Sequence, residues 1–112
     1  MHKLVEQIIK LGGIDTEITR IHIDEWFENA TIGFFGNEDK EVVCKFKQCF
    51  EVSLKHDRNY LKERNSDDSL SYKYFIQDVR IIKNDEFYVF EISAWPLAGK
   101  IICKEICIDI QN

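Results

Sequence analysis

Cysteine and histidine are the residue types in this chain that could hold a metal ion, and their spacing is the first test of that chemistry. Cys103 and Cys107 are four residues apart, as many pairs of metal ligands are. On a strand, which the surrounding pattern indicates, their side chains point the same way but sit roughly 13 Å apart, too far to share one zinc ion. Cys44 and Cys49 are five residues apart and point to opposite faces of one strand. We therefore predict four buried or half-buried thiols, with no metal ion and no cofactor.

A second chemical candidate is the pair His56 and Asp57, which is similar to the His-Asp pair of metal phosphohydrolases. Those pairs lie on helices and need further His and Asp ligands, whereas this chain has only two other histidines. We interpret His56 as a solvated residue at the end of a strand. Its neighbours Arg58 and Tyr60 favour a polar binding patch on the loop that follows.

Other catalytic motifs are absent from the sequence. It contains no glycine-rich phosphate loop, no serine nucleophile elbow and no cysteine with a motif-placed histidine. The paired carboxylates Asp67 and Asp68 lie in a polar segment, where solvated charge is more common than acid–base catalysis. We therefore predict no catalytic residues and a protein that is not an enzyme.

Two tryptophans, Trp26 and Trp95, each lie at the end of a strand beside a turn. One interpretation is that they cap the core, and the alternative is that they anchor a binding surface, where Trp and Tyr are enriched. On the second interpretation they join the charged and aromatic residues of the long loop. The candidate binding surface is Trp26, His56, Arg58, Tyr60, Asp67, Asp68 and Trp95.

The elements that must position these residues follow from hydrophobic periodicity, most clearly between Glu41 and Lys55. Every second residue from Val42 to Leu54 is apolar except Gln48, which predicts a long strand with one dry face, bent near Gln48. On this pattern Phe50 faces the core and Cys49 does not. Leu4 to Leu11 repeats at helical spacing and stops at two glycines, which predicts a short helix. Further strands are predicted at 17–24, 30–35, 72–83, 87–95 and 100–110, with a loop at 56–71.

These elements predict an α+β fold in one domain, residues 1–112. A short N-terminal helix packs on a mostly antiparallel sheet of about six strands, arranged as two meanders joined by the loop. An open sheet and a two-layer sandwich are both consistent with the pattern. Nothing in the sequence protects the sheet edges, so a homodimer through edge strands is a further possibility.

The net charge of the chain indicates which classes of partner it is expected to bind. Twenty acidic and fifteen basic residues give the 112-residue chain a net charge of -5, which disfavours nucleic-acid binding and mildly favours a basic protein partner. Charged and polar residues interrupt the apolar start, so we expect no signal peptide, no membrane span and a cytoplasmic location.

Two stretches, Tyr74 to Ile81 and Ile101 to Ile108, resemble strands of small uncharacterised bacterial proteins, several of them of toxin-immunity type. The resemblance covers size, acidity and strand style over most of the chain and includes no diagnostic motif. It implies a cytosolic, non-enzymatic module that binds and neutralises a partner toxin. The alternative from another class is a small-ligand binder or enzyme that uses the loop from His56 to Ser71.

Overall fold

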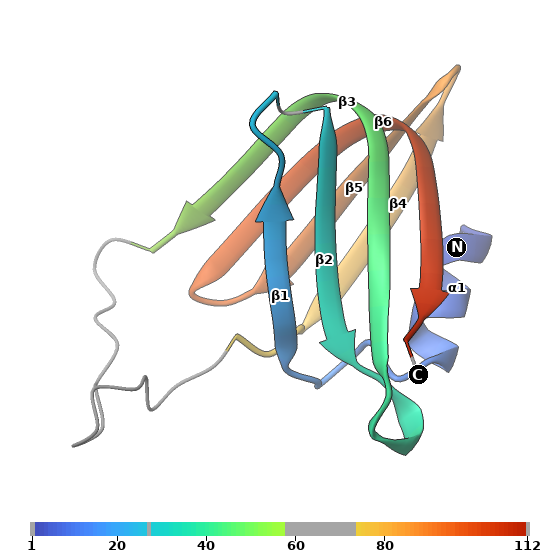
Figure 1. Ribbon diagram of the computed structural model, residues 1–112, viewed down its shortest axis with the longest axis vertical. Coiled ribbons are helices and arrows are strands. Elements are labelled where there is room, and N and C mark those ends of the chain that lie inside the picture. The colour runs from blue at the N-terminus through green and yellow to red at the C-terminus, as the bar shows by residue number, and fades with distance from the viewer. Residues whose placement is uncertain (1, 27, 58–73, 112) are drawn as a thin grey trace.

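The computed structural model describes residues 2–26, 28–57 and 74–111. Within these residues the chain forms one helix, one short 3-10 turn and six strands. They are α1 (Lys3–Lys10), β1 (Ile18–Ile23), β2 (Asn29–Phe35), η1 (Asn37–Asp39), β3 (Glu41–His56), β4 (Asp78–Asn84), β5 (Phe87–Ala94) and β6 (Leu97–Ile110). All strand pairs are antiparallel and the order is β1-β2-β3-β6-β5-β4 (Figure 1). The prediction of two meanders is confirmed, and β3 and β6 join them at the centre of the sheet.

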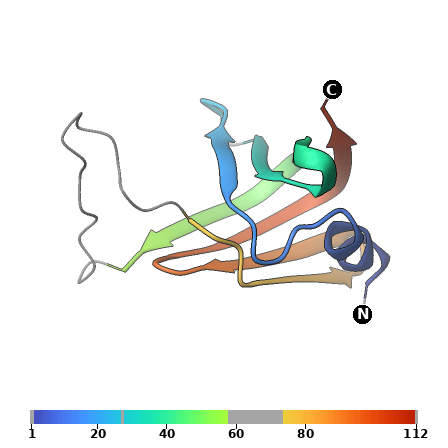
Figure 2. The ribbon, with the colours of Figure 1, turned by 90° about the horizontal axis from the view of Figure 1, so that it is seen from below.

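The sheet is bent, and each half uses a different part of the two long strands. β2 pairs with Glu41 to Lys47 of β3, whereas β5 pairs with Leu97 to Cys103 of β6. Figure 2 shows the two halves inclined toward one another, with α1 next to β4. Of the two arrangements that the sequence left open, the open sheet forms and the two-layer sandwich does not, because both halves belong to one continuous sheet.

The bend coincides with a β-bulge in β3. Gln48 has a φ of 54°, and the register with β6 shifts by one residue between Cys49 and Glu51. These two irregularities interrupt the alternation only at Cys49 and Phe50, since Val52 and Leu54 pack against the core as predicted. Cys49 therefore packs against the core, and Phe50 is 59% exposed on the outer face. The bend near Gln48 was predicted, but the faces predicted for these two residues were wrong.

Strand β6 shows a similar switch. Ile101 and Cys103 are buried. A regular alternation would bury Glu105 next, but Ile106 is buried instead. One unbroken alternation from Lys100 to Ile110, which the sequence predicts, therefore does not hold. The break faces the bulge of β3, since Cys103 is the register partner of Cys49.

Helix α1 forms as predicted, and its sequence supplies both ends. The Nδ1 atom of His2 accepts a hydrogen bond from the amide of Leu4 at 3.1 Å, which caps the first turn. Gly12, with a φ of 91°, follows the helix in a conformation that glycine adopts without strain. Val5 and Ile8 are buried in the core. The described residues include no helix with the length and apolar character needed to cross a bilayer.

The core lies inside the bend and receives side chains from both halves of the sheet. The rings of Phe46 on β3 and Phe90 on β5 have centroids 4.6 Å apart. Phe46 is directly opposite Ala30 and Ile106, so the contact links the first meander to the second. These side chains and α1 form one hydrophobic cluster.

The segments that precede the two edge strands, β1 and β4, are bonded to each other. Glu17 and Phe75 form an isolated antiparallel bridge, and the amide of Ile18 donates to the carbonyl of Tyr74 at 2.8 Å. In the described part of the predicted strand 72–83, regular pairing begins at Asp78, while residues 72 and 73 lie outside the described residues. Of the loop predicted at 56–71, His56 is instead the last residue of β3, and residues 58–71 lie outside the described residues.

An ion pair on the outer face connects β1 to the start of β3. Arg20 Nη2 donates to Glu41 Oε1 at 2.6 Å, and the hydroxyl of Thr19 donates to Glu41 Oε2. The Thr19 hydrogen bond, followed by Arg20, holds the pKa of the Glu41 carboxyl below its ordinary value.

Candidate interaction surface

The four cysteines are free thiols. Cys44 and Cys103 are buried, and Cys49 and Cys107 are half-buried, which confirms the predicted burial. Burial raises the pKa of Cys44 and of Cys103 to about 12, so both stay protonated near neutral pH. Among the described residues, no group of three or more His, Cys, Asp or Glu side chains is arranged to hold a metal ion.

Three of the seven residues predicted for the binding surface lie in the described part of the chain: Trp26, His56 and Trp95. The other four, Arg58, Tyr60, Asp67 and Asp68, lie outside the described residues, so their place on a surface stays a prediction.

The structure brings His56 and Trp95 to the same end of the sheet. His56 pairs with Leu97 at the start of β6, and the amide of Asp57 donates to the carbonyl of Pro96 at 2.9 Å. The ring of His56 lies 6.0 Å from that of Tyr74. The Trp95 amide donates to Gln77 Oε1 at 3.2 Å. This end is therefore an ordered junction between β3, the β5–β6 turn and the segment that precedes β4.

Trp26 lies elsewhere, in the turn between β1 and β2, and its side chain is 76% exposed. The carbonyl of Glu28 in the same turn accepts a hydrogen bond from the amide of Cys49 at 2.9 Å, so the turn sits against the bulge of β3. His56 is seven residues further along β3, a separation of about 23 Å in an extended strand. Of the three candidates that the structure describes, Trp26 therefore lies apart from His56 and Trp95.

The turn that carries Trp26 is ordered by its own polar residues. Asp24 Oδ1 accepts from the amide of Glu28 at 2.9 Å, and Asp24 Oδ2 accepts from Asn29 Nδ2 at 3.0 Å. Desolvation acts to raise the pKa of Asp24, but the hydrogen bonds from Asn29 and the turn amides outweigh it, and its pKa is lowered. Glu25 and Glu28 are exposed, so this turn presents an indole among carboxylates.

A cluster of apolar side chains on the outer face was not predicted from the sequence. Its members are Phe50, Ile82, Phe87, Val89 and Ile102, which we call the apolar patch. The rings of Phe50 and Phe87 pack edge to face with centroids 4.8 Å apart. Ile102, Val89 and Ile82 are direct register partners on β6, β5 and β4. A signal existed for β5, which is apolar on both faces, but the bulge that turns Phe50 outward has no clear signature in the sequence.

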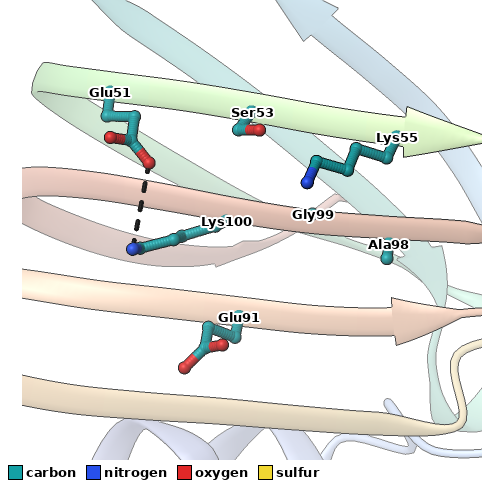
Figure 3. Close-up of a pocket in the computed structure, with 7 residues that line it drawn as sticks. All are labelled: Glu51, Ser53, Lys55, Glu91, Ala98, Gly99 and Lys100. Atoms are coloured by element: carbon teal, nitrogen blue, oxygen red, sulfur yellow. Dashed lines mark ion pairs between the residues drawn. The ribbon is translucent and has the colours of Figure 1, made fainter.

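Charged residues border the apolar patch on the same outer face. A hollow of about 340 Å³ there is lined by Glu51, Ser53, Lys55, Glu91, Ala98, Gly99 and Lys100 (Figure 3). Lys100 Nζ lies 4.0 Å from Glu51 Oε2. The adjoining residues Asp78 and Arg80 continue this strip to β4. The strip carries both charge signs, so it can form ion pairs and hydrogen bonds.

The family model described as immunity protein PIM7 matches residues 1–110 of the chain. The crystal structure of an uncharacterized protein from Neisseria gonorrhoeae has a TM-score of 0.63 and 15% sequence identity to this chain. The match covers 86% of this chain and 91% of that one, and at this identity it shows the fold alone. No curated protein matches the chain. The predicted resemblance to proteins of toxin-immunity type is confirmed by the family match.

Proposed function

The chain belongs to the PIM7 immunity-protein family, and from this premise we propose that it binds a toxin and neutralises it through a non-covalent interface. The match over residues 1–110 is the observation that carries the proposal. The exposed surface supports it, because Trp26, Phe50 and Phe87 expose aromatic side chains of the kind enriched in protein interfaces.

Neutralisation by binding alone requires no catalytic group on the immunity protein. The polar groups of the outer face are arranged for ion pairing, and the two most buried thiols are held protonated. The protein then acts stoichiometrically, by covering a surface that the toxin needs. The net charge of -5 supports a toxin with a basic surface, and we place the encounter in the cytoplasm of a bacterium.

The test is co-expression of this chain with the toxin encoded beside its gene. We expect the wild-type chain to restore growth, and the purified proteins to form a complex of one chain per toxin with a dissociation constant of about 1–100 nM. An unrelated toxin of similar charge is the control. A chain that neither restores growth nor co-elutes with the toxin contradicts the proposal.

Intact-mass measurement of the toxin after co-expression separates binding from catalysis. We expect an unchanged mass. A covalent change that depends on this chain would replace the binding proposal with an enzymatic one.

A further inference from the structure

The apolar patch and the turn that carries Trp26 meet at the bulge of β3. Phe50 follows Cys49, whose amide is bonded to the carbonyl of Glu28, and the ring of Phe50 contacts Phe87 on β5. In Figure 1 the β1–β2 turn, the bend of β3 and the β4–β5 turn all lie along the upper edge of the sheet. We call this surface, made of the apolar patch and of Asp24, Glu25, Trp26, Glu28 and Asn29, the aromatic end.

We infer that the aromatic end is the surface on which the toxin docks, and this inference rests on the proposed function. The toxin is expected to present an apolar centre that covers Phe50 and Phe87, with basic side chains where it meets the β1–β2 turn. The end of the molecule that holds His56 and Trp95 stays outside the interface.

The first argument is that the outer face of the sheet exposes a group of apolar side chains to water. Phe50, Ile82 and Phe87 are each at least 36% exposed, and Ile102 and Val89 join them into one patch. Burying such a patch releases the water around it, and side chains of this type at the centre of an interface commonly dominate its affinity. Trp26, the most exposed of the large apolar residues that the structure describes, adds a second anchor at the rim.

The second argument is rigidity. The bulge is held by the Glu28–Cys49 hydrogen bond, the turn is held by the bonds to Asp24, and Phe87 and Val89 lie on a strand with neighbours on both sides. Side chains on a rigid support lose little additional freedom when a partner covers them, so more of the contact energy appears as affinity.

The third argument is charge complementarity, which selects the class of partner. Asp24, Glu25 and Glu28 place three carboxylates in a turn of six residues that contains no Lys or Arg. The carboxylates of this turn attract a basic surface of the toxin, which brings Trp26 into contact with that surface. The bordering strip, which includes Lys100 and Glu91, carries both charge signs. It therefore favours a toxin surface on which acidic and basic side chains are arranged to match it over a surface that is uniformly basic.

The apolar contribution is tested with the variants Phe50→Ser and Trp26→Ala, measured by titration calorimetry against the toxin that the wild-type chain neutralises. We expect each to weaken binding by about 30-fold or more, as hot-spot residues do. Phe35→Ser is the matched control, because Phe35 is also exposed but lies six residues from Asn29 at the far end of β2, about 20 Å away. It should change the affinity by less than about 3-fold. Circular dichroism melts confirm that each variant is folded.

The electrostatic contribution is tested with the double variant Glu25→Lys/Glu28→Lys, which keeps Asp24 and its structural hydrogen bonds. The control is Glu6→Lys/Glu38→Lys, which reverses two exposed charges on α1 and η1. Each double variant changes the net charge by +4, from -5 to -1. We expect the turn variant to slow association about 10-fold at low salt, an effect that shrinks at high salt, and the control to have a much smaller effect.

The outcomes separate the two proposals. If the wild-type chain binds the toxin and both Phe50→Ser and Trp26→Ala bind as tightly, the aromatic end is not the docking surface, although the proposed function stands. If the wild-type chain binds no toxin, the proposed function itself fails. If light scattering shows a wild-type dimer that Phe50→Ser dissociates, the aromatic end joins two copies of this chain and the inference is overturned.

Discussion

Phe46 and Phe50 lie four residues apart on the same strand, yet they have opposite environments. Phe46 is 0% exposed and packs against Phe90, whereas Phe50 is largely exposed and contacts Phe87 on the outer face. Four residues along a regular strand lead back to the same face, so the difference arises from the bulge between them. The same residue type therefore serves the core at one position and a surface at the other.

This contrast gives a stability prediction for a matched pair of substitutions. Phe46→Ala should lower the free energy of unfolding by about 3–5 kcal/mol, because it removes buried contacts and leaves a cavity. Phe50→Ala should change it by less than about 1 kcal/mol, since most of its ring is already in water. Urea unfolding followed by circular dichroism measures both values. Equal losses would show that Phe50 is a core residue.

The buried thiols make stability depend on pH in the alkaline range. The pKa values of Cys44 and Cys103 are raised from 9.0 to about 12 by desolvation. A raised pKa in the folded state means that the unfolded chain releases its proton first. The stabilisation is therefore complete below about pH 9 and is lost as the pH rises toward 12.

We expect the free energy of unfolding to fall above pH 9, by about 1.4 kcal/mol per pH unit for each of the two thiols. The double variant Cys44→Ala/Cys103→Ala should be less stable at neutral pH but should show a shallower slope between pH 9 and 11. Urea unfolding across this pH range in the presence of a reductant provides the comparison. Identical slopes would contradict the assignment to these thiols.

At the scale of elements, β3 and β6 are single strands that serve two halves of a bent sheet. Their first and second parts pair with different neighbours, and in both strands the alternation of buried side chains is interrupted at the level of the Cys49–Cys103 pair. A bulge increases the local twist and bends the strand, which allows one continuous sheet to enclose a core. The same bend turns Phe50 outward and creates the apolar patch.

Substitutions of Gln48 test whether the bend of β3 is the conformation that the strand prefers. Its φ of 54° lies in the left-handed region, which costs a residue other than glycine about 1 kcal/mol. Gln48→Gly should therefore raise the free energy of unfolding by up to about 1 kcal/mol. Gln48→Val should lower it by about 1–2 kcal/mol, because a β-branched side chain is poorly tolerated there. Stabilisation by valine would mean that the strand prefers to be regular.

At the scale of the whole molecule, the two halves share one core and should not unfold separately. The Phe46–Phe90 contact, helix α1 and the long β3–β6 pairing all connect the first meander to the second. A domain of this size with one hydrophobic cluster is expected to unfold in a single cooperative transition.

The two tryptophans provide a direct measurement, because they lie at opposite ends of the second part of β3. In the variants Trp26→Phe and Trp95→Phe, fluorescence reports on one end of the molecule at a time. We expect both fluorescence curves to give the same urea midpoint as circular dichroism recorded on the same variant. A lower midpoint at one end would show that the halves unfold independently.

The sequence by itself determined the short helix, the strands, their grouping into two meanders and the buried or half-buried state of the thiols. These properties follow from local periodicity and from the few residues that end or turn an element, such as Gly12 and the polar stretch before Glu41. The family-level expectation of a toxin-immunity protein also came from the sequence, through strand style and acidity, and the family match confirms it.

The tertiary structure alone decided where the exposed surface lies. Periodicity assigns a face only while the register is unbroken, and the bulge at Cys49 and Phe50 is fixed by pairing with β6 and by the contact with Glu28 of the β1–β2 turn. These partners are about 20 to 55 residues away in the sequence, so no local pattern contains them. The physical reason is that an irregularity in the pairing changes the face of the side chains at that point, and only the partner strand sets where it occurs.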